Sequence, residues 1–427
     1  MDHFRVYEHR ALRTDKVDDA GQKITLQQLK LLQAYHGEKG TSFFTLINNG
    51  VKFCEYVGVL QVGSLTIEVL PKTDALDDKD TWQRFLISML RTTGMLDIEQ
   101  TGFASLKLKS NSILDLYFLL FLKEVKYLVQ TGLVKKYKSI EGNSFALKGN
   151  LVFGKHIQQN LVHAERFYVR SSVYSHDNIF NRLLVKTAKL IALIAKPSIS
   201  AAAKSILFDL PECGDIAVNE TTFTKLVFGR KTDVYKTAIG IARLLLLNYH
   251  PDIRRGENNV IALMFDMNAL WERYVYRTLK RKLNETNPGE YEVREQLPSG
   301  FWKPTEGSIR TIRPDIVIYR NPQKEQAHIV LDTKWKRPNN NKPDDGDLKQ
   351  MLVYNLYKTA ARSALVYPGT PASKFVEGSF QINGHGNCSL VFLPLQNVDG
   401  SIHLELATLI SLIKNDYQMI QNSNLDT

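Results

Sequence analysis

The sequence predicts an α/β protein, in which an α+β N-terminal region precedes a separate α/β domain. Three observations predict this class. Short runs of β-branched and aromatic residues fill the first hundred positions, and apolar residues then recur with a helical period. The last part orders its elements as helix, three strands, helix and strands. We therefore expect a β-rich N-terminal region at 1–100, a mainly helical region at 101–255 and a third domain at 256–427.

The β-rich region is predicted from three runs that are separated by turn residues. Strands are expected over Thr41–Ile47, Val51–Val62 and Ser64–Leu70. The dipeptide Asn49-Gly50 lies between the first two runs and is typical of a hairpin turn.

The middle region shows apolar residues at the 3.6-residue spacing of helices. A helix that starts after the acidic patch at 74–80 is expected to stop at Gly94. Five further helices are expected over Asn111–Leu133, Asp177–Ala195, Ile199–Phe208, Glu220–Val227 and Lys231–Asn248. The polar stretch PDIRRGENN at 251–259 is the best candidate for a linker between domains.

The third domain begins with a predicted helix over Met264–Asn284, with Asp266 or Asn268 near its N-terminus. Strands, a second helix and further strands follow. Their predicted ranges are Tyr291–Leu297, Ile309–Tyr319 and His328–Trp335 for the first strands, Asp347–Ala361 for the helix, and Ser363–Tyr367 and Cys388–Leu393 for the last strands.

Composition limits the classes of function. The chain has 427 residues, of which 44% are hydrophobic and 23% charged, so it can bury a sizeable core and is not disordered. It carries 55 Lys and Arg against 44 Asp and Glu, and the resulting charge of +11 favours a polyanionic partner. The three cysteines lack a CxxC spacing, and no stretch is typical of a signal peptide or membrane span. We therefore expect a cytoplasmic location and no membrane partner.

Two carboxylates and a lysine in the third domain carry the chemical signal. Asp315 occurs in RPDIVIY, and Asp332 and Lys334 occur in IVLDTKWK. Alternation along a strand places Asp332 and Lys334 on one face, and Thr333 and Trp335 on the other. Antiparallel pairing of the two strands would bring Asp315 and Asp332 together, as a hard divalent cation requires.

This set suits phosphodiester hydrolysis. The two carboxylates would hold Mg²⁺, and Lys334 would orient the attacking water or offset charge on the phosphate. The pattern is the PD-(D/E)xK signature of restriction-type nucleases. The motif is short, and a strand with a surface ion pair explains it about equally well. The flanking helices favour the nuclease, because they carry Glu272 as a candidate accessory acid and Gln350 and Tyr354 as an i, i+4 pair on one face.

Longer motifs give a more specific signal than the three charged residues. The sequence resembles the McrC family, the nuclease subunits of McrBC-type modification-dependent restriction systems. The matching stretches are YVGVLQVGSLTIEVLPK, GLVKKY, FALKGNLVFGKHI, HDNIFNRLL, and DMNALWERY, RPDIVIY and LDTKWK through QMLVY. They extend over nearly the whole chain.

The resemblance implies a fold, a site and a partner. It implies a restriction-endonuclease-like PD-(D/E)xK domain with Asp315, Asp332 and Lys334 as catalytic residues, and Glu272 and Gln350 as further site residues. It also implies an AAA+ GTPase ring of the McrB type as partner, which recognises modified cytosine in double-stranded DNA and holds the GTP. In the family, the N-terminal part of the chain docks into that ring, and the chain stimulates GTP hydrolysis.

Two further sets of residues need a choice between explanations. Arg273, Arg277, Lys280 and Lys336, with Tyr354, are candidates for DNA contact, although a solvated helix face is the commoner explanation of such basic runs, and an aromatic at this spacing is commonly core. The stretch GNLVFGKH at 149–156 matches part of a phosphate-binding loop. It has His156 where Ser or Thr should bind Mg²⁺ and is apolar inside, so we interpret it as an ordinary strand.

Two other functions stay open on the sequence alone. The chain could be a GTPase-stimulating adaptor with an inactive nuclease, or a stand-alone PD-(D/E)xK DNA repair nuclease. The complete Asp315, Asp332 and Lys334 set argues against the first. Cleavage without any GTPase would identify the second.

Overall fold

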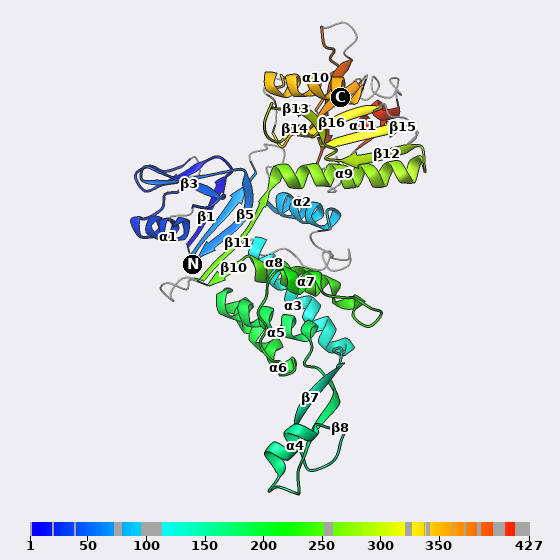
Figure 1. The fold of residues 1–427 in the computed structure, drawn as a ribbon. Helices are drawn as coiled ribbons and strands as arrows, with labels where there is room; N and C mark the ends of the chain where they lie inside the picture. Colours follow the sequence, from blue (N-terminus) through cyan, green and yellow to red (C-terminus); the bar gives the residue numbers. More distant parts are fainter. Residues whose placement is uncertain are drawn as a thin grey trace. The chain divides into compact units, whose positions relative to one another are not determined.

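A computed structural model of the chain describes residues 2–18, 21–37, 40–71, 79–94, 113–251, 259–320, 327–336, 338, 342–360, 362–370, 373–381, 386–395 and 406–414. These residues form two compact units (Figure 1). The first unit comprises residues 1–60, 65–96 and 264–427, and the second comprises 61–64 and 97–263. The predicted N-terminal and third regions therefore lie in one unit. The predicted linker at 251–259 lies mostly outside the described residues, at 252–258.

The N-terminal part of the first unit contains small sheets and two helices. Its elements are β1 (Asp2–Tyr7), β2 (Ala11–Arg13), α1 (Leu26–His36), β3 (Phe44–Ile47), β4 (Gly50–Phe53), β5 (Tyr56–Val62), β6 (Leu65–Leu70) and α2 (Lys79–Thr92). Strand β1 pairs in parallel with β6, and β2, β4 and β3 form an antiparallel sheet. Helix α1 starts where the Thr25 and Gln28 side chains cap each other's backbone N–H groups.

The predicted hairpin between β3 and β4 is confirmed, although its turn lies one residue earlier. Ile47 pairs with Gly50, so Asn48 and Asn49 form the turn, and Asn49 adopts the left-handed conformation with φ +57°. Gly50 belongs to β4 instead. A Cβ atom there would lie 2.3 Å from the carbonyl oxygen of Leu12, so close strand pairing requires glycine at this position.

The C-terminal part of the first unit is a five-stranded sheet with a helix on each face. Its elements are α9 (Met267–Thr286), β12 (Tyr291–Glu295), β13 (Ser299–Trp302), β14 (Arg310–Ile312), β15 (Ile316–Arg320), β16 (Ile329–Thr333), α10 (Asp345–Lys358), β17 (Arg362–Gly369), β18 (Asn387–Pro394) and α11 (Ala407–Lys414). The strand order is β12-β15-β16-β17-β18; β12, β15 and β16 pair antiparallel, and β16, β17 and β18 pair in parallel. Figure 1 shows α9 and α10 on opposite sides of this sheet.

The two helices are fixed by caps and by aromatic packing. Asp266, one of the two residues predicted near the start of this helix, caps α9 by accepting hydrogen bonds from the backbone of Asn268 and Ala269. Trp271 of α9 is fully buried, and its ring centroid lies 5.5 Å from that of Trp335 at the end of β16. On the other face, Met351 of α10 lies in a buried cluster with residues of β15–β18. The α/β prediction is thus confirmed.

The second unit is mainly helical, with a small three-stranded sheet. Its elements are α3 (Ile113–Thr131), β7 (Lys136–Ser144), β8 (Asn150–Leu151), α4 (Phe153–Asn160), β9 (Phe167–Ser175), α5 (Ile179–Ile194), α6 (Pro197–Asp209), α7 (Glu220–Thr224), the 3₁₀ helix η2 (Asp233–Tyr235), α8 (Lys236–Leu247) and β10 (Tyr249–Pro251), which pairs with β11 (Asn259–Asp266). The five helices predicted from periodicity are present. The stretch GNLVFGKH was interpreted as a strand, and this was wrong beyond Leu151, because α4 begins at Phe153.

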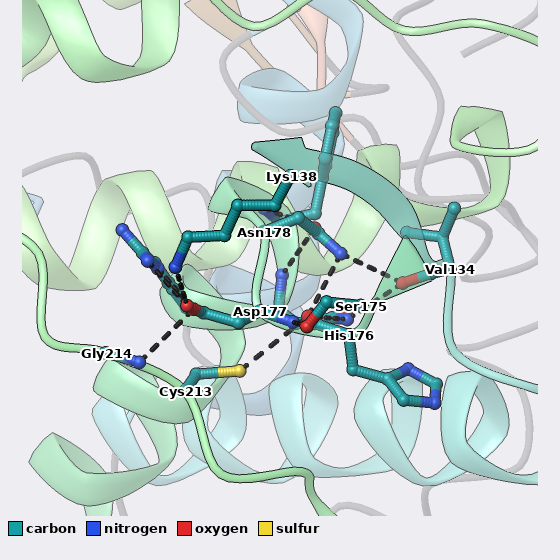
Figure 2. A network of polar contacts seen from close by, with 11 residues as sticks. Val134, Lys138, Ser175, His176, Asp177, Asn178, Cys213 and Gly214 are labelled. Atoms are coloured by element: carbon teal, nitrogen blue, oxygen red, sulfur yellow. Dashed lines mark hydrogen bonds and ion pairs between the residues drawn. The ribbon is translucent and has the colours of Figure 1, made fainter. Parts of the chain in front are cut away.

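Asp177 joins β9 to the helices of the second unit (Figure 2). Its carboxylate accepts a hydrogen bond from Arg182 Nη2 at 2.7 Å, another from Lys138 Nζ at 2.6 Å, and one from the backbone N–H of Gly214 at 3.2 Å. Asn178, the next residue, caps α5. The cationic partners Arg182 and Lys138 hold the pKa of Asp177 well below its usual range.

We expect Asp177→Asn to lower the free energy of unfolding by about 1–2 kcal/mol at pH 7, because the amide cannot accept the fork of Arg182. Because the pKa of Asp177 is lower in the folded state, this carboxylate stabilises the protein fully above the unfolded-state pKa of about 4. The stabilisation is lost progressively as the pH falls below that value. The difference between variant and wild type should therefore shrink from pH 7 to pH 3 in thermal unfolding. Asp215→Asn is the control, because Asp215 also binds a lysine but its side chain is 85% exposed. Equal losses in both variants would contradict this role.

Candidate functional site

The ends of two paired strands bring the predicted carboxylates together. Ile316 of β15 pairs with Leu331 of β16 in an antiparallel register. Asp315, the residue before Ile316, therefore lies opposite Asp332, the residue after Leu331. Asp332 is 1% exposed. The antiparallel pairing expected from the sequence is confirmed.

Thr333 anchors Asp315. Both its backbone N–H and its hydroxyl donate to Asp315 Oδ2, at 2.7 and 2.8 Å, and neither bond uses Oδ1. Strand alternation predicted that Thr333 points away from the site. Its hydroxyl nevertheless reaches Asp315, because Asp315 precedes β15 and its side chain does not follow that strand's alternation.

Lys334 lies among acceptors. Its Nζ is 2.7 Å from Asp332 Oδ2 and 3.4 Å from Asp347 Oδ1. It also donates a hydrogen bond of 3.1 Å to Gln350 Oε1. Burial lowers the pKa of Lys334, but the negative charges of Asp332 and then Asp347 raise it by a larger amount. The pKa of Lys334 therefore lies above its usual value. The ammonium group is therefore held charged beside the two strand carboxylates.

Gln350 is positioned from the core. Its amide nitrogen donates to the hydroxyl of Tyr354 at 2.6 Å, and that hydroxyl donates to the carbonyl of Arg313 at 3.0 Å. Tyr354 is 4% exposed and lies in the buried cluster under α10. The predicted i, i+4 pair thus links the core to Lys334. Tyr354 presents no exposed ring to a nucleic acid.

Glu272 approaches from α9, on the other side of the sheet. Its Oε1 accepts a 2.6 Å hydrogen bond from the side chain of Gln296, whose backbone N–H donates to the carbonyl of Asp315 at 3.0 Å. Gln296 has φ +50°, a conformation that non-glycine residues rarely adopt. Such strain is concentrated at functional sites.

The carboxyl groups share one low-dielectric region. Burial and then Asp315 raise the pKa of Glu272 to about 7. Burial and then Asp315 likewise raise the pKa of Asp332 to about 7, against the opposing effect of Lys334. Burial raises the pKa of Asp315, while its bonds from Thr333 act in the other direction. Glu272 and Asp332 therefore hold protons more readily than ordinary carboxyl groups do, and a bound cation would oppose this.

The carboxylates fit a magnesium ion in part. Within the part of the chain that the structure describes, no group of three or more His, Cys, Asp or Glu side chains could hold a metal ion alone. Mg²⁺, however, is usually held by one or two carboxylates and keeps several waters. Asp315 and Asp332 could supply two such oxygen ligands, and a cation between them would relieve the repulsion of their carboxylates.

The basic residues proposed for DNA contact are exposed. Arg273, Arg277 and Lys280 project from α9 at helical spacing and are exposed. Arg273 also lines a cavity of about 590 Å³ that includes Glu272 and Gln296. Lys336 is 48% exposed and binds Asp347 Oδ2 at 2.7 Å.

The sequence did not indicate three of the residues that shape the site. These are Thr333, Gln296 and Asp347, of which Asp347 lies on the helix that carries Gln350. Only Asp347 had a detectable signal, since it lies three residues before Gln350 on the same helical face. The contacts of Gln296 depend on a backbone conformation that the sequence does not reveal.

Comparisons with known proteins are consistent with the fold and motifs. The chain is 22% identical over 291 residues to the type IV methyl-directed restriction enzyme EcoKMcrBC of Escherichia coli K12, covering 64% of this chain and 81% of that protein. It shares its fold with a chain in the refined half-complex of Thermococcus gammatolerans McrB AAA+ hexamers with bound McrC, at a TM-score of 0.72 and 20% identity, covering 97% of this chain and 100% of that one. A structure of the Thermococcus gammatolerans McrBC complex matches at a TM-score of 0.52 and 20% identity, covering 66% and 88%.

The family match covers most of the chain. Residues 51–368 match the family described as the McrBC 5-methylcytosine restriction system component. This range begins within β4 and ends within β17, and it includes all the residues of the candidate site. The chain therefore belongs to the McrBC 5-methylcytosine restriction system component family.

Proposed function

We propose that this chain is the Mg²⁺-dependent DNA endonuclease subunit of a GTP-dependent restriction complex directed at modified cytosine. The observation that best supports this proposal is that Asp315, Asp332 and Lys334 lie together where two paired strands end, in a chain of this family. A surface ion pair does not explain the cluster, because Asp332 is buried and a second carboxyl group, that of the partly buried Asp315, lies opposite it on the paired chain segment.

The proposed chemistry assigns a separate task to each side chain. Asp315 and Asp332 would hold Mg²⁺, which when bound polarises the scissile phosphate and activates water. Lys334 orients the attacking water and offsets the negative charge that grows on the phosphate. Gln350 keeps Lys334 in place, and Tyr354 keeps Gln350 in place. Glu272, with its pKa of about 7, can exchange a proton at neutral pH.

DNA would approach over α9. Arg273, Arg277 and Lys280 are exposed there, and Lys336 lies beside Lys334 in sequence, so phosphates along the duplex would meet positive charge on the way to the site. Tyr354 acts in this proposal as a positioning residue instead of a DNA contact.

We further propose that the chain docks on an AAA+ GTPase ring of the McrB type and stimulates it. The structural relative from Thermococcus gammatolerans is bound to such hexamers. The second unit also exposes apolar side chains on and beside β7 and α4, as protein-binding surfaces do. These are Tyr137 (76% exposed), Phe145 (76%), Phe153 (68%), Leu161 (79%) and Val162 (88%). GTP would be bound by the ring.

The helices within the described residues include none with the length and apolar character of a membrane span.

The experiment uses the chain purified together with its ring partner. Cleavage of methylated and unmethylated duplex DNA is followed with and without Mg²⁺ and GTP. We expect cutting of the methylated duplex only, and only when both Mg²⁺ and GTP are present. Cutting by the chain alone without GTP would identify a stand-alone nuclease. Stimulated GTP hydrolysis with no cleavage under any condition would identify an adaptor.

A further inference from the structure

A basic pocket lies in the N-terminal part of the first unit, among residues that the candidate nuclease site does not use. Its volume is about 450 Å³, and it is formed by β1, β2 and the segments beside them. Four basic residues and one acidic residue line it, so its formal charge is 4 − 1 = +3. The residues that matter are Arg5, Tyr7, Arg10, Arg13, Lys16 and Asp18.

Strand alternation explains why these side chains meet. Arg5 and Tyr7 share one face of β1, while Val6 between them is 2% exposed and points into the core. On β2, Arg13 lies on the opposite face from Leu12, which is fully buried. The walls are held by backbone hydrogen bonds, from Arg10 to Tyr7 at 3.1 Å and from Ile24 to Arg13 at 3.1 Å.

When the buried Glu68 is counted with the lining residues, four basic residues still stand against two acidic ones. Arg5 Nε lies 3.5 Å from Oε2 of the buried Glu68. Arg13 donates to the carbonyl of Asn48 at 3.3 Å, and a carbonyl does not neutralise a guanidinium. The carboxylate of Asp18 accepts the backbone N–H of Gln22 at 2.7 Å and so closes a turn.

We propose that this pocket binds the phosphate groups of duplex DNA, as a second anchoring point for the substrate. Three of the four cations are arginines, whose planar forks match phosphate oxygens. Tyr7 adds an aromatic ring that is 53% exposed and can lie against a sugar or a base. An acidic protein partner would account for the arginines but less well for the exposed ring of Tyr7. The choice of DNA rests on the proposed function, but phosphate binding does not.

The test measures affinity of the full chain for a fluorescent duplex by anisotropy, without Mg²⁺ and between 50 and 200 mM salt. We expect Arg10→Ala with Lys16→Ala to weaken binding about 10-fold and to lower the slope of log K against log salt by about 2, since each phosphate contact contributes about 0.9. Lys16→Ala alone, at an exposed position, should give about half the slope change. The matched control is Lys30→Ala with Lys126→Ala, which also removes two exposed cations but none from the pocket.

The result separates this proposal from the proposed function. Equal weakening by the pocket and control variants, or unchanged affinity in the pocket variant, would overturn the anchoring site. Loss of ring binding or of GTP-dependent behaviour with unchanged DNA affinity would also overturn it and would point to a protein or nucleotide ligand. The measurement follows DNA binding without Mg²⁺, so a failure of cleavage alone does not count against the pocket.

Discussion

Asp332→Asn is expected to lower the rate of cleavage of methylated DNA by roughly 10³-fold when the chain is assayed with its ring partner, Mg²⁺ and GTP. Asp332 would be a ligand of Mg²⁺, and its carboxylate also lies 2.7 Å from Lys334. The amide keeps the shape of the side chain but removes the negative charge that both interactions require. GTP hydrolysis by the ring should be unchanged, because the substitution lies in the first unit and removes no apolar surface.

The same substitution is expected to raise the midpoint of thermal unfolding at pH 8 in the absence of Mg²⁺. Burial and Asp315 raise the folded-state pKa of Asp332 to about 7, above the unfolded value of about 4. Stability from this group is therefore full below pH 4 and is lost as pH rises through 7. Asparagine carries no ionisable group at this buried position. The difference in unfolding midpoint between the variant and the wild type should therefore be largest at pH 8 and should shrink toward pH 5.

Asp345→Asn is the control for both measurements. Asp345 is an exposed carboxylate in the first turn of α10. It should leave cleavage and thermal stability within a small margin of wild type. Cleavage by Asp332→Asn at the wild-type rate would contradict the site assignment.

The sheet that carries the site could be predicted because its signals are local. Short apolar runs in RPDIVIY and IVLDTKWK predicted two strands, and their antiparallel pairing places Asp315 opposite Asp332. Asp266 and Asn268 were both candidates near the start of α9, because a helix needs acceptors for its first N–H groups, and the structure shows Asp266 as the cap. The long motifs then predicted the family that the comparisons show.

Features that depend on tertiary structure could not be predicted in this way. The hydrogen bond from Gln296 to Glu272 depends on a left-handed backbone angle in a loop. The segment at 149–156 looked like a strand because its interior is apolar, yet α4 starts there. The packing of α2 against α9, which includes a T-shaped contact of Phe85 with Tyr274, joins segments nearly two hundred residues apart. No local pattern records such a contact.

Lys334→Met is expected to lower the cleavage rate by roughly 10²–10⁴-fold, with little change in binding of duplex DNA. Methionine keeps most of the length of the side chain but loses the ammonium group that faces Asp332, Asp347 and Gln350. The attacking water then has no cation to orient it. The charge that grows on the phosphate also loses a compensating group.

Lys336→Met separates a role in the reaction from the general loss of a positive charge. Both lysines bind Asp347, Lys336 at 2.7 Å and Lys334 at 3.4 Å, so each substitution disturbs the same carboxylate. Lys336 is 48% exposed and Lys334 is 22% exposed, and only Lys334 also reaches Asp332 and Gln350. The Lys336 variant should therefore bind DNA slightly more weakly, with the largest loss of affinity at low salt. Its maximal cleavage rate at saturating DNA should equal that of the wild type. If both variants lose the same maximal rate, the effect arises from Asp347 or from net charge, and Lys334 has no separate part in the reaction.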